Sequence, residues 1–151
     1  MGYPSLWQYK GRYVYLRLDR YPNLLGLFYL DGIFVDQNYD IAHSYFSEAA
    51  KQELPEAWLE LGAIYGKGLG VEADRALSIE FYEKAAELGD VMADFNLGVI
   101  FINADGVPRD VDRGIKHLIN AAELGHDEAK LVLLKLKEEH GFNVPTYVTV
   151  Q

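Results

Sequence analysis

The sequence predicts an all-α protein, an α-solenoid made of stacked helix pairs. The main observation is an internal repeat, because the pentapeptide AAELG at residues 85–89 returns unchanged at residues 121–125, a spacing of 36 residues. A fixed period of this length is typical of helical repeats, in which each unit buries its apolar face against its neighbours. Other small and apolar residues keep the same spacing: Ala57, Ala93 and Ala129; Leu61, Leu97 and Leu133; Gly62 and Gly98.

Length and composition are consistent with a single domain over residues 1–151. Half of the residues are hydrophobic, which suits a globular chain with enough apolar surface for a core. No apolar run reaches the roughly 18 residues of a membrane span, and the N-terminus lacks the pattern of a secretion signal. There is no cysteine, which excludes disulfides and favours a cytoplasmic protein, or a periplasmic or secreted one if a signal peptide was removed.

The best-defined unit, residues 57–92, is predicted to form two helices. The first, over residues 56–65, places its apolar side chains on one stripe at helical spacing. A glycine-rich turn follows, and Asp74 is the expected N-cap of the second helix. That helix is expected to end before Gly89, because glycine readily takes the left-handed conformation at a helix C-terminus.

The same plan extends along the chain. Residues 93–128 repeat it with Asp110 as the cap of the second helix, and residues 21–56 follow it with fewer matching positions. Small residues recur where two helix backbones are expected to approach each other closely. The predicted organisation is an N-terminal cap segment, three repeats, a closing helix and a tail: residues 1–20, 21–56, 57–92, 93–128, 129–139 and 140–151.

These motifs resemble the Sel-one-like repeat, a longer-period relative of the tetratricopeptide repeat. The shared pattern is Ala-x3-Leu-Gly-x2-Tyr, then Gly-x-Gly-Val, an aspartate and Ala-Ala-x2-Gly. It is most complete over residues 57–128, good over 21–56, partial over 129–139 and absent at both ends. The resemblance implies a right-handed solenoid of antiparallel helix pairs that acts as an adaptor or scaffold without catalysis of its own. It also points to a bacterial protein.

The start of the chain, residues 5–19, allows two interpretations. Alternating side chains over residues 13–18 are typical of a strand, and Lys10 and Gly11 would then form the turn of a hairpin. Other apolar residues keep helical spacing instead and would supply a capping helix. These are Leu6, Tyr9, Tyr13 and Leu16. We favour the helix as the prediction for this segment.

The predicted closing helix is apolar on two sides, which is unusual for the last helix of a repeat array. Leu131, Val132 and Leu134 lie outside the stripe that is expected to face the stack. We therefore expect the tail to fold back across this helix and cover it. Its apolar residues are Phe142, Val144, Tyr147, Val148 and Val150. A second copy of the chain that covers the helix, giving a dimer, is the alternative.

Patterns that suggest catalytic or cofactor chemistry are incomplete. The glycines at positions 66, 68 and 70 follow a helix rather than a strand, so they indicate an inter-helix turn rather than a phosphate-binding loop. Asp110 and Asp112 lack the later ligands of a calcium loop. No serine or cysteine nucleophile motif is present, and the histidines lack the spacing of zinc ligands. They are His43, His117, His126 and His140. The sequence predicts no enzyme activity, no cofactor and no metal site.

Charge is distributed unevenly along the chain. The first twenty residues carry four basic residues against one acidic residue, a net charge of +3, whereas the remainder carries 22 acidic and 10 basic residues, a net charge of −12. An acidic surface repels the phosphate backbone, so nucleic acid is not expected as a ligand. Solubility is the simplest interpretation of this charge, and a basic partner is the more specific one.

The first helices of the repeats are expected to line the inner surface of the solenoid. Positions 3, 7 and 10 of each first helix would then face this groove, one turn apart. Most of them are apolar, and exposed apolar patches often mark binding sites. Packing between repeats is the alternative role of the same side chains. The predicted partner-binding residues are Leu27, Leu30, Leu59, Ala63, Met92, Phe95, Val99, Ile102, Asn103, Leu131 and Lys135.

The predicted function is a non-catalytic adaptor or scaffold that binds a peptide or helix of a partner protein in the groove. Acidic residues near the groove edge would favour basic flanks in the partner; they are Glu56, Glu60, Asp94 and Glu128. The alternative is a bacterial neutralising, immunity-type or regulatory protein that binds one specific enzyme or toxin. Neither a membrane nor nucleic acid is expected as a partner, and the sequence leaves the oligomeric state open.

Overall fold

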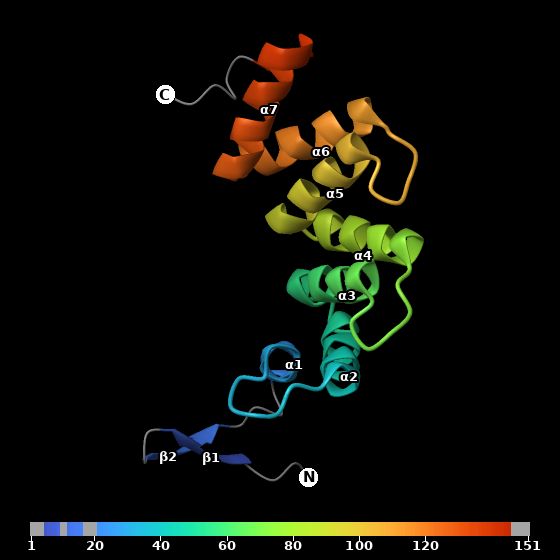
Figure 1. Ribbon diagram of the computed structural model, residues 1–151. Helices are drawn as coiled ribbons and strands as arrows, with labels where there is room; N and C mark the ends of the chain where they lie inside the picture. Colours follow the sequence, from blue (N-terminus) through green and yellow to red (C-terminus); the bar gives the residue numbers. More distant parts are fainter. Residues whose placement is uncertain (1–4, 10–11, 17–20, 146–151) are drawn as a thin grey trace.

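The structure is a computed structural model that describes residues 5–9, 12–16 and 21–145 (Figure 1). Within these residues a short β-hairpin precedes a series of α-helices. The strands are β1 (Ser5–Tyr9) and β2 (Arg12–Leu16). The helices are α1 (Pro22–Asp31), α2 (Tyr39–Ala50), α3 (Pro55–Lys67), α4 (Arg75–Glu87), α5 (Val91–Asn103), α6 (Val111–Glu123) and α7 (Asp127–His140).

Successive helices pack against each other to form an α-solenoid. The antiparallel pairs α1–α2, α3–α4 and α5–α6 follow one another along the stack, and α7 packs on α6 at its end (Figure 1). We call α1, α3, α5 and α7 the first helices, and α2, α4 and α6 the second helices. The predicted solenoid of helix pairs is therefore confirmed.

Within each pair, a glycine of the first helix faces a large side chain of the second helix. A Cβ atom added at any of these glycines would lie 2.7 Å or less from an atom of that side chain, which is closer than packed atoms approach. The absence of a side chain thus allows the two helices to come together. The pairs recur with the sequence period: Gly26 with Phe46, Gly62 with Tyr82, and Gly98 with Leu118.

Buried side chains form three clusters that follow one another along the stack. The first joins α2 to α3 around Phe46, the second joins α4 to α5 around Leu97, and the third joins α6 to α7 around Leu118 and Leu133. Because each cluster lies between neighbouring repeats, no helix pair completes its core alone.

The helix ends are capped as the sequence predicts. The carboxylates of Asp74 and Asp110 each accept a hydrogen bond of 3.0 Å from the backbone N–H three residues further on. Asp90 caps α5 in the same way at 2.8 Å. Gly89 and Gly125, which follow the ends of α4 and α6, both have a φ of 94°, a conformation that favours glycine.

The helix predicted for residues 5–19 is wrong, because β1 and β2 pair as an antiparallel hairpin. Ser5 lies opposite Leu16 and Tyr9 opposite Arg12. The segment is rich in aromatic residues, which favour strands, and its alternating pattern therefore outweighs the helical spacing. The turn predicted at Lys10 and Gly11 falls outside the described residues.

The tail folds back on α7 over its described part. Val144 is 4% exposed and belongs to the cluster that contains Leu133 and Leu136, and Phe142 packs against the same cluster. Tyr147, Val148 and Val150, which the sequence also predicts to cover α7, lie outside the described residues. Over its described part the tail therefore packs on the stack-facing side of α7, while Leu131, which it was expected to cover, is 54% exposed.

No helix in the described part of the chain has the length and apolar character needed to cross a membrane.

Candidate functional site

The residues predicted to bind a partner divide into an exposed group and a packed group. Met92 and Leu131 are 45% and 54% exposed, and the side chains of Asn103 and Lys135 are also exposed. The others are half-buried. They are Leu27, Leu30, Leu59, Ala63, Phe95, Val99 and Ile102.

Several half-buried members take part in packing between helices. Leu27 and Leu30 pack against the cluster between α2 and α3, and Leu59 packs against the cluster between α4 and α5. Ile102 faces α6, because a Cβ atom at Gly114 would lie 2.6 Å from its Cγ1. For these residues the structure shows the alternative role, packing within the solenoid.

Phe95, Met92 and His126 form a local cluster between α5 and the start of α7. The rings of Phe95 and His126 stack with their centroids 4.5 Å apart. His126 caps α7, since its Nδ1 accepts a hydrogen bond of 3.2 Å from the N–H of Ala129. Its Nε2 then carries the proton and lies 3.2 Å from the sulfur of Met92. Phe95 also packs against the α6–α7 cluster, so it is both a core residue and a surface residue.

A hollow of about 200 Å³ lies beside these residues, between α4 and α5. Two of the predicted groove residues, Phe95 and Val99, form part of its wall. A salt bridge of 2.9 Å between Arg75 and Asp105 borders it. The lining residues are Arg75, Tyr82, Phe95, Asn96, Val99, Ile100 and Asp105.

Glu60 occupies on α3 the position that Asn96 occupies on α5, one period earlier. Burial raises the pKa of its carboxyl group, and the nearby charges of Asp31 and Asp90 raise it further, while Lys67 lowers it. Burial also raises the pKa of the Tyr82 phenol. A carboxylate with two acidic neighbours is stabilised by any cation that approaches it.

Asp94 does not lie at the groove edge, where the sequence analysis placed it. Its side chain is buried and points to α6, where Oδ1 lies 2.8 Å from Nδ1 of His117. The cause is its position on α5, because residue 94 lies on the side of the helix that faces the second helices. Asp94 therefore holds two helices together and is not available to a partner.

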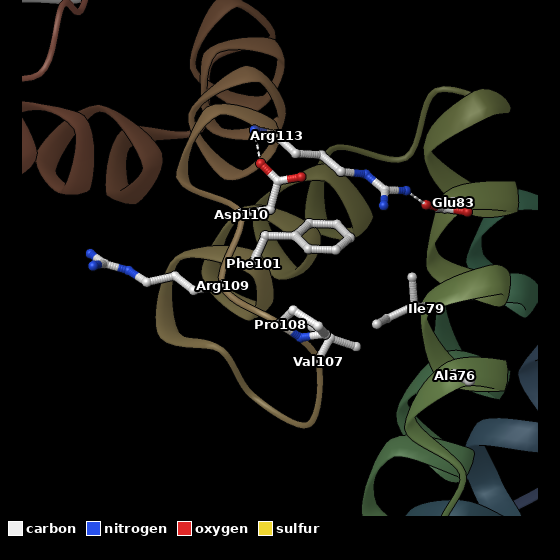
Figure 2. A pocket seen from close by; sticks show the side chains of 9 residues that line it. All are labelled: Ala76, Ile79, Glu83, Phe101, Val107, Pro108, Arg109, Asp110 and Arg113. Atoms are coloured by element: carbon white, nitrogen blue, oxygen red, sulfur yellow. Dashed lines mark hydrogen bonds and ion pairs between the residues drawn. The ribbon is translucent and has the colours of Figure 1, made fainter.

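The second helices carry hollows that the sequence analysis did not predict. Figure 2 shows one of about 460 Å³ between α4 and α6, with Phe101 of α5 in its wall. The guanidinium of Arg113 lies 4.2 Å from the centre of the Phe101 ring and forms an ion pair with Glu83. The side chain of Arg109 points away from this hollow (Figure 2). A comparison of the second helices across the 36-residue period is the sequence signal that could have found these residues.

The described residues contain no group of three or more histidine, cysteine, aspartate or glutamate side chains placed to hold a metal ion. His43, His117 and His126 each bond to a different partner: Tyr65, Asp94 and Met92. These three histidines thus have partners within the fold.

The comparisons with known proteins agree with this architecture. The family model described as Sel1 repeat matches residues 23–54, 55–90 and 91–126. Among solved structures, a Sel1 repeat protein from Oxalobacter formigenes is 28% identical with a TM-score of 0.75, and the match covers 84% of this chain and 52% of that one. A protective antigen of uropathogenic Escherichia coli strains that displays an SLR fold is 31% identical with a TM-score of 0.72.

The match to the antigen covers 78% of this chain but 26% of the antigen. The chain therefore spans about a quarter of one of these structures and about half of the other. No curated protein matches the sequence. Because three consecutive matches to the family model cover most of the helical stack, the chain belongs to the Sel1 repeat family.

Proposed function

We propose that the protein is a non-catalytic interaction module that binds an apolar peptide or helix of a partner protein along its first helices. Sel1 repeat proteins generally mediate protein–protein interactions. In this chain the proposed binding surface, which we call the first-helix face, is formed by the exposed parts of α3, α5 and α7.

One observation carries the proposal: apolar side chains remain exposed on this face, and one of them, Met92, lies close to a hollow. Met92 and Leu131 are 45% and 54% exposed, although both lie on well-packed helices. Met92 contacts His126, which stacks on Phe95, and Phe95 lines the hollow. An amphipathic helix or extended peptide could cover the exposed side chains and place one of its own in the hollow.

The electrostatics of the face favour a partner that also carries basic residues. Glu60 has the raised pKa of a carboxyl group that is partly removed from water and lies near Asp31 and Asp90. A lysine or arginine of the partner would compensate this concentration of negative charge. The net charge of −9 would also accelerate the approach of a basic protein.

Affinity purification with matched variants tests this proposal. The test bait is the double variant Met92→Glu/Leu131→Glu, which places two charges on the first-helix face. The control bait is Leu124→Glu, which changes a leucine that is 59% exposed but lies in the turn after α6. Phe95→Glu is unsuitable as the main variant, because Phe95 also packs in the core.

The proposal predicts a partner that wild type and Leu124→Glu recover and that the double variant loses, while all three proteins keep the same helix content. Recovery of the same partner by the double variant would overturn the proposal. The stoichiometry separates two functions: several partners indicate an adaptor, whereas one stoichiometric enzyme or toxin indicates the neutralising protein that is the alternative.

A further inference from the structure

A second surface feature lies on the other side of the solenoid, between α2 and α4. It is a hollow of about 370 Å³ whose wall is largely aromatic, and α3 contributes to its floor. It includes none of the residues predicted to bind a partner. The lining residues are His43, Ser47, Ala50, Lys51, Trp58, Leu61, Tyr65 and Phe81.

Three aromatic rings meet around Phe81 in this hollow. The centroids of Trp58 and Phe81 are 5.5 Å apart, as are those of Tyr65 and Phe81. The hydroxyl of Tyr65 forms a hydrogen bond of 3.1 Å with Nε2 of His43, which holds the tyrosine ring in place. Aromatic rings around one hollow can hold a cation, because the faces of aromatic rings carry partial negative charge.

In the next repeat, the chain itself places a cation over the corresponding aromatic ring. There the aromatic ring is Phe101, the cation above it is Arg113, and the carboxylate that pairs with the arginine is Glu83. Figure 2 shows this arrangement, in which Arg113 reaches from α6 toward α4 over Phe101.

One period earlier, the aromatic ring is kept but the arginine is missing. Tyr65 corresponds to Phe101, whereas Leu77 corresponds to Arg113 and Ser47 to Glu83. The hollow between α2 and α4 thus has an aromatic platform without the guanidinium that covers its counterpart.

The charges around the aromatic hollow also favour a cation. Lys116 lies on the wall of a second hollow between α4 and α6, distinct from the one in Figure 2 and also lined by Glu83 and Arg113. Its counterpart one period earlier is the exposed Glu80. Lys51 does line the aromatic hollow, but its ammonium group is paired with Glu48 at 2.9 Å. Residues 39–87, which span α2 to α4, carry ten acidic and four basic residues, so the field at this surface attracts positive charge.

We propose that this aromatic hollow receives the guanidinium group of an arginine from a partner protein. The arginine would lie over Tyr65 as Arg113 lies over Phe101, and Glu80, which is exposed on α4 next to Phe81, would supply the negative charge that Glu83 supplies in the next repeat. Arginine suits the site better than lysine, because its planar and weakly hydrated guanidinium stacks on aromatic rings. The site is separate from the first-helix face, so a partner can use either surface or both.

Trp58 provides the reporter for a test. Its indole N–H is buried and has no hydrogen-bond partner among the described residues, so its NMR signal is sensitive to a ligand in the hollow. The chain has two tryptophans, and a Trp7→Phe variant assigns the signal. The probe is the capped tripeptide acetyl-Gly-Arg-Gly-amide, and the comparison probes carry leucine or lysine in place of arginine.

Two variants change the aromatic hollow itself, and a third serves as the control. Leu77→Arg/Ser47→Glu copies the arrangement of Arg113 and Glu83 and should occupy the site from within. Phe81→Leu removes one aromatic wall while keeping an apolar side chain, and it serves if the double variant fails to fold. The Leu131→Glu variant, changed on the first-helix face, should bind the probe like wild type.

The proposal predicts a saturable shift of the Trp58 signal with the arginine probe, a weaker response to lysine, and the weakest to leucine. The filled variant or Phe81→Leu should reduce the arginine response at least several-fold. An equal or stronger response to leucine would overturn the proposal, because the hollow would then be an anchor for apolar side chains. So would the absence of any shift, or a shift that both variants leave unchanged. The first-helix face is tested by a separate experiment, the recovery of a partner by wild type and by Met92→Glu/Leu131→Glu. None of the outcomes of the probe titration therefore affects that proposal.

Discussion

Oδ1 of Asp94 lies 2.8 Å from Nδ1 of His117, and this contact ties α5 to α6 from a buried position. The carboxylate is 7% exposed and the imidazole 17%. The imidazole also stacks on Phe101, with the ring centroids 6.0 Å apart. Nδ1 of His117 carries a proton that it donates to the carboxylate, since an ionised aspartate can only accept.

We expect His117→Ala to destabilise the fold by about 1–3 kcal/mol, because it leaves a buried carboxylate without its donor. Urea unfolding followed by circular dichroism measures the change. The neighbouring exposed residue provides the control, since Lys116→Ala should change the free energy of unfolding by less than about 0.5 kcal/mol. In a double-mutant cycle with Asp94→Ala, additive losses would show that the two residues do not interact.

The second prediction concerns pH and Glu60. Because the pKa of this carboxyl group is raised in the folded state above its ordinary value of 4.5, the folded protein binds the proton more tightly than the unfolded chain. Its contribution to stability is therefore fully present below pH 4.5 and is lost as the pH rises through the folded pKa. Glu60→Gln should be more stable than wild type at pH 7, and this advantage should shrink as the pH falls toward 4.5.

Urea midpoints of wild type and Glu60→Gln at a series of pH values measure this difference. Glu72→Gln, which changes an exposed residue of the loop after α3, is the control. A constant difference between Glu60→Gln and wild type across the pH range would contradict the assignment of burial and Asp31 as the cause.

The third prediction concerns the contact between Gly98 and Leu118. A Cβ atom at Gly98 would lie 2.6 Å from Cγ of Leu118 and 3.1 Å from the carbonyl oxygen of Gly114. Gly98→Val should therefore overpack the α5–α6 interface and cost roughly 1–3 kcal/mol. Thermal unfolding measures this loss of stability. Val99→Ala, which changes the half-buried next residue, is the control. An unchanged melting temperature for Gly98→Val would mean that the two helices do not approach as closely as described.

The fourth prediction separates backbone strain from close contact. Gly106 and Gly141 have similar positive φ values, 73° and 67°, but a Cβ atom at Gly106 would lie 2.7 Å from Cγ of Arg75, whereas nothing lies within 4 Å of one at Gly141. Both alanine variants should lose about 1–2 kcal/mol through the left-handed conformation. Gly106→Ala should lose more, because it also displaces Arg75 from its contact with Asp105. Chemical denaturation compares them, and equal losses would show that the close approach does not matter.

The fifth prediction concerns the cover on α7. Val144→Ala should reduce the free energy of unfolding by about 1–2 kcal/mol, because it removes buried methyl groups from the cluster around Leu133 and Leu136. Asn143→Ala, at an exposed neighbouring position, should have little effect.

Truncation after Glu139 should additionally promote association of the protein, which sedimentation velocity detects. If the truncated chain were as stable and as monodisperse as the full chain, the tail would not be a cover.

Much of the fold could be predicted because its causes lie close together in the sequence. Asp74 and Asp110 bond to backbone groups three residues away, so a cap is visible from the local pattern alone. The glycines at positions 62 and 98 recur with the period and mark the close approach of two helices. Local hydrogen bonds and backbone sterics are enough for both predictions.

The hairpin and the groove show where local patterns were not enough. Residues 5–16 carry strand-like alternation and helical spacing at once, and only the pairing of β1 with β2 decides between them. Asp94 and Ile102 lie on α5 at positions that a helical wheel places near the groove. The rotation of α5 about its own axis turns both toward α6 instead.

The sequence by itself determined the period, the helix pairs, their caps and the family, because these depend on contacts within a repeat that the next repeat copies. The tertiary structure decided which side chains stay exposed and which aromatic ring lies beneath a cation. Met92 and Leu131 remain on the surface, and Arg113 covers Phe101, whereas Leu77 occupies the position of that arginine in the preceding repeat. These outcomes depend on contacts between repeats and on how far each side chain reaches across them, and no single repeat encodes either.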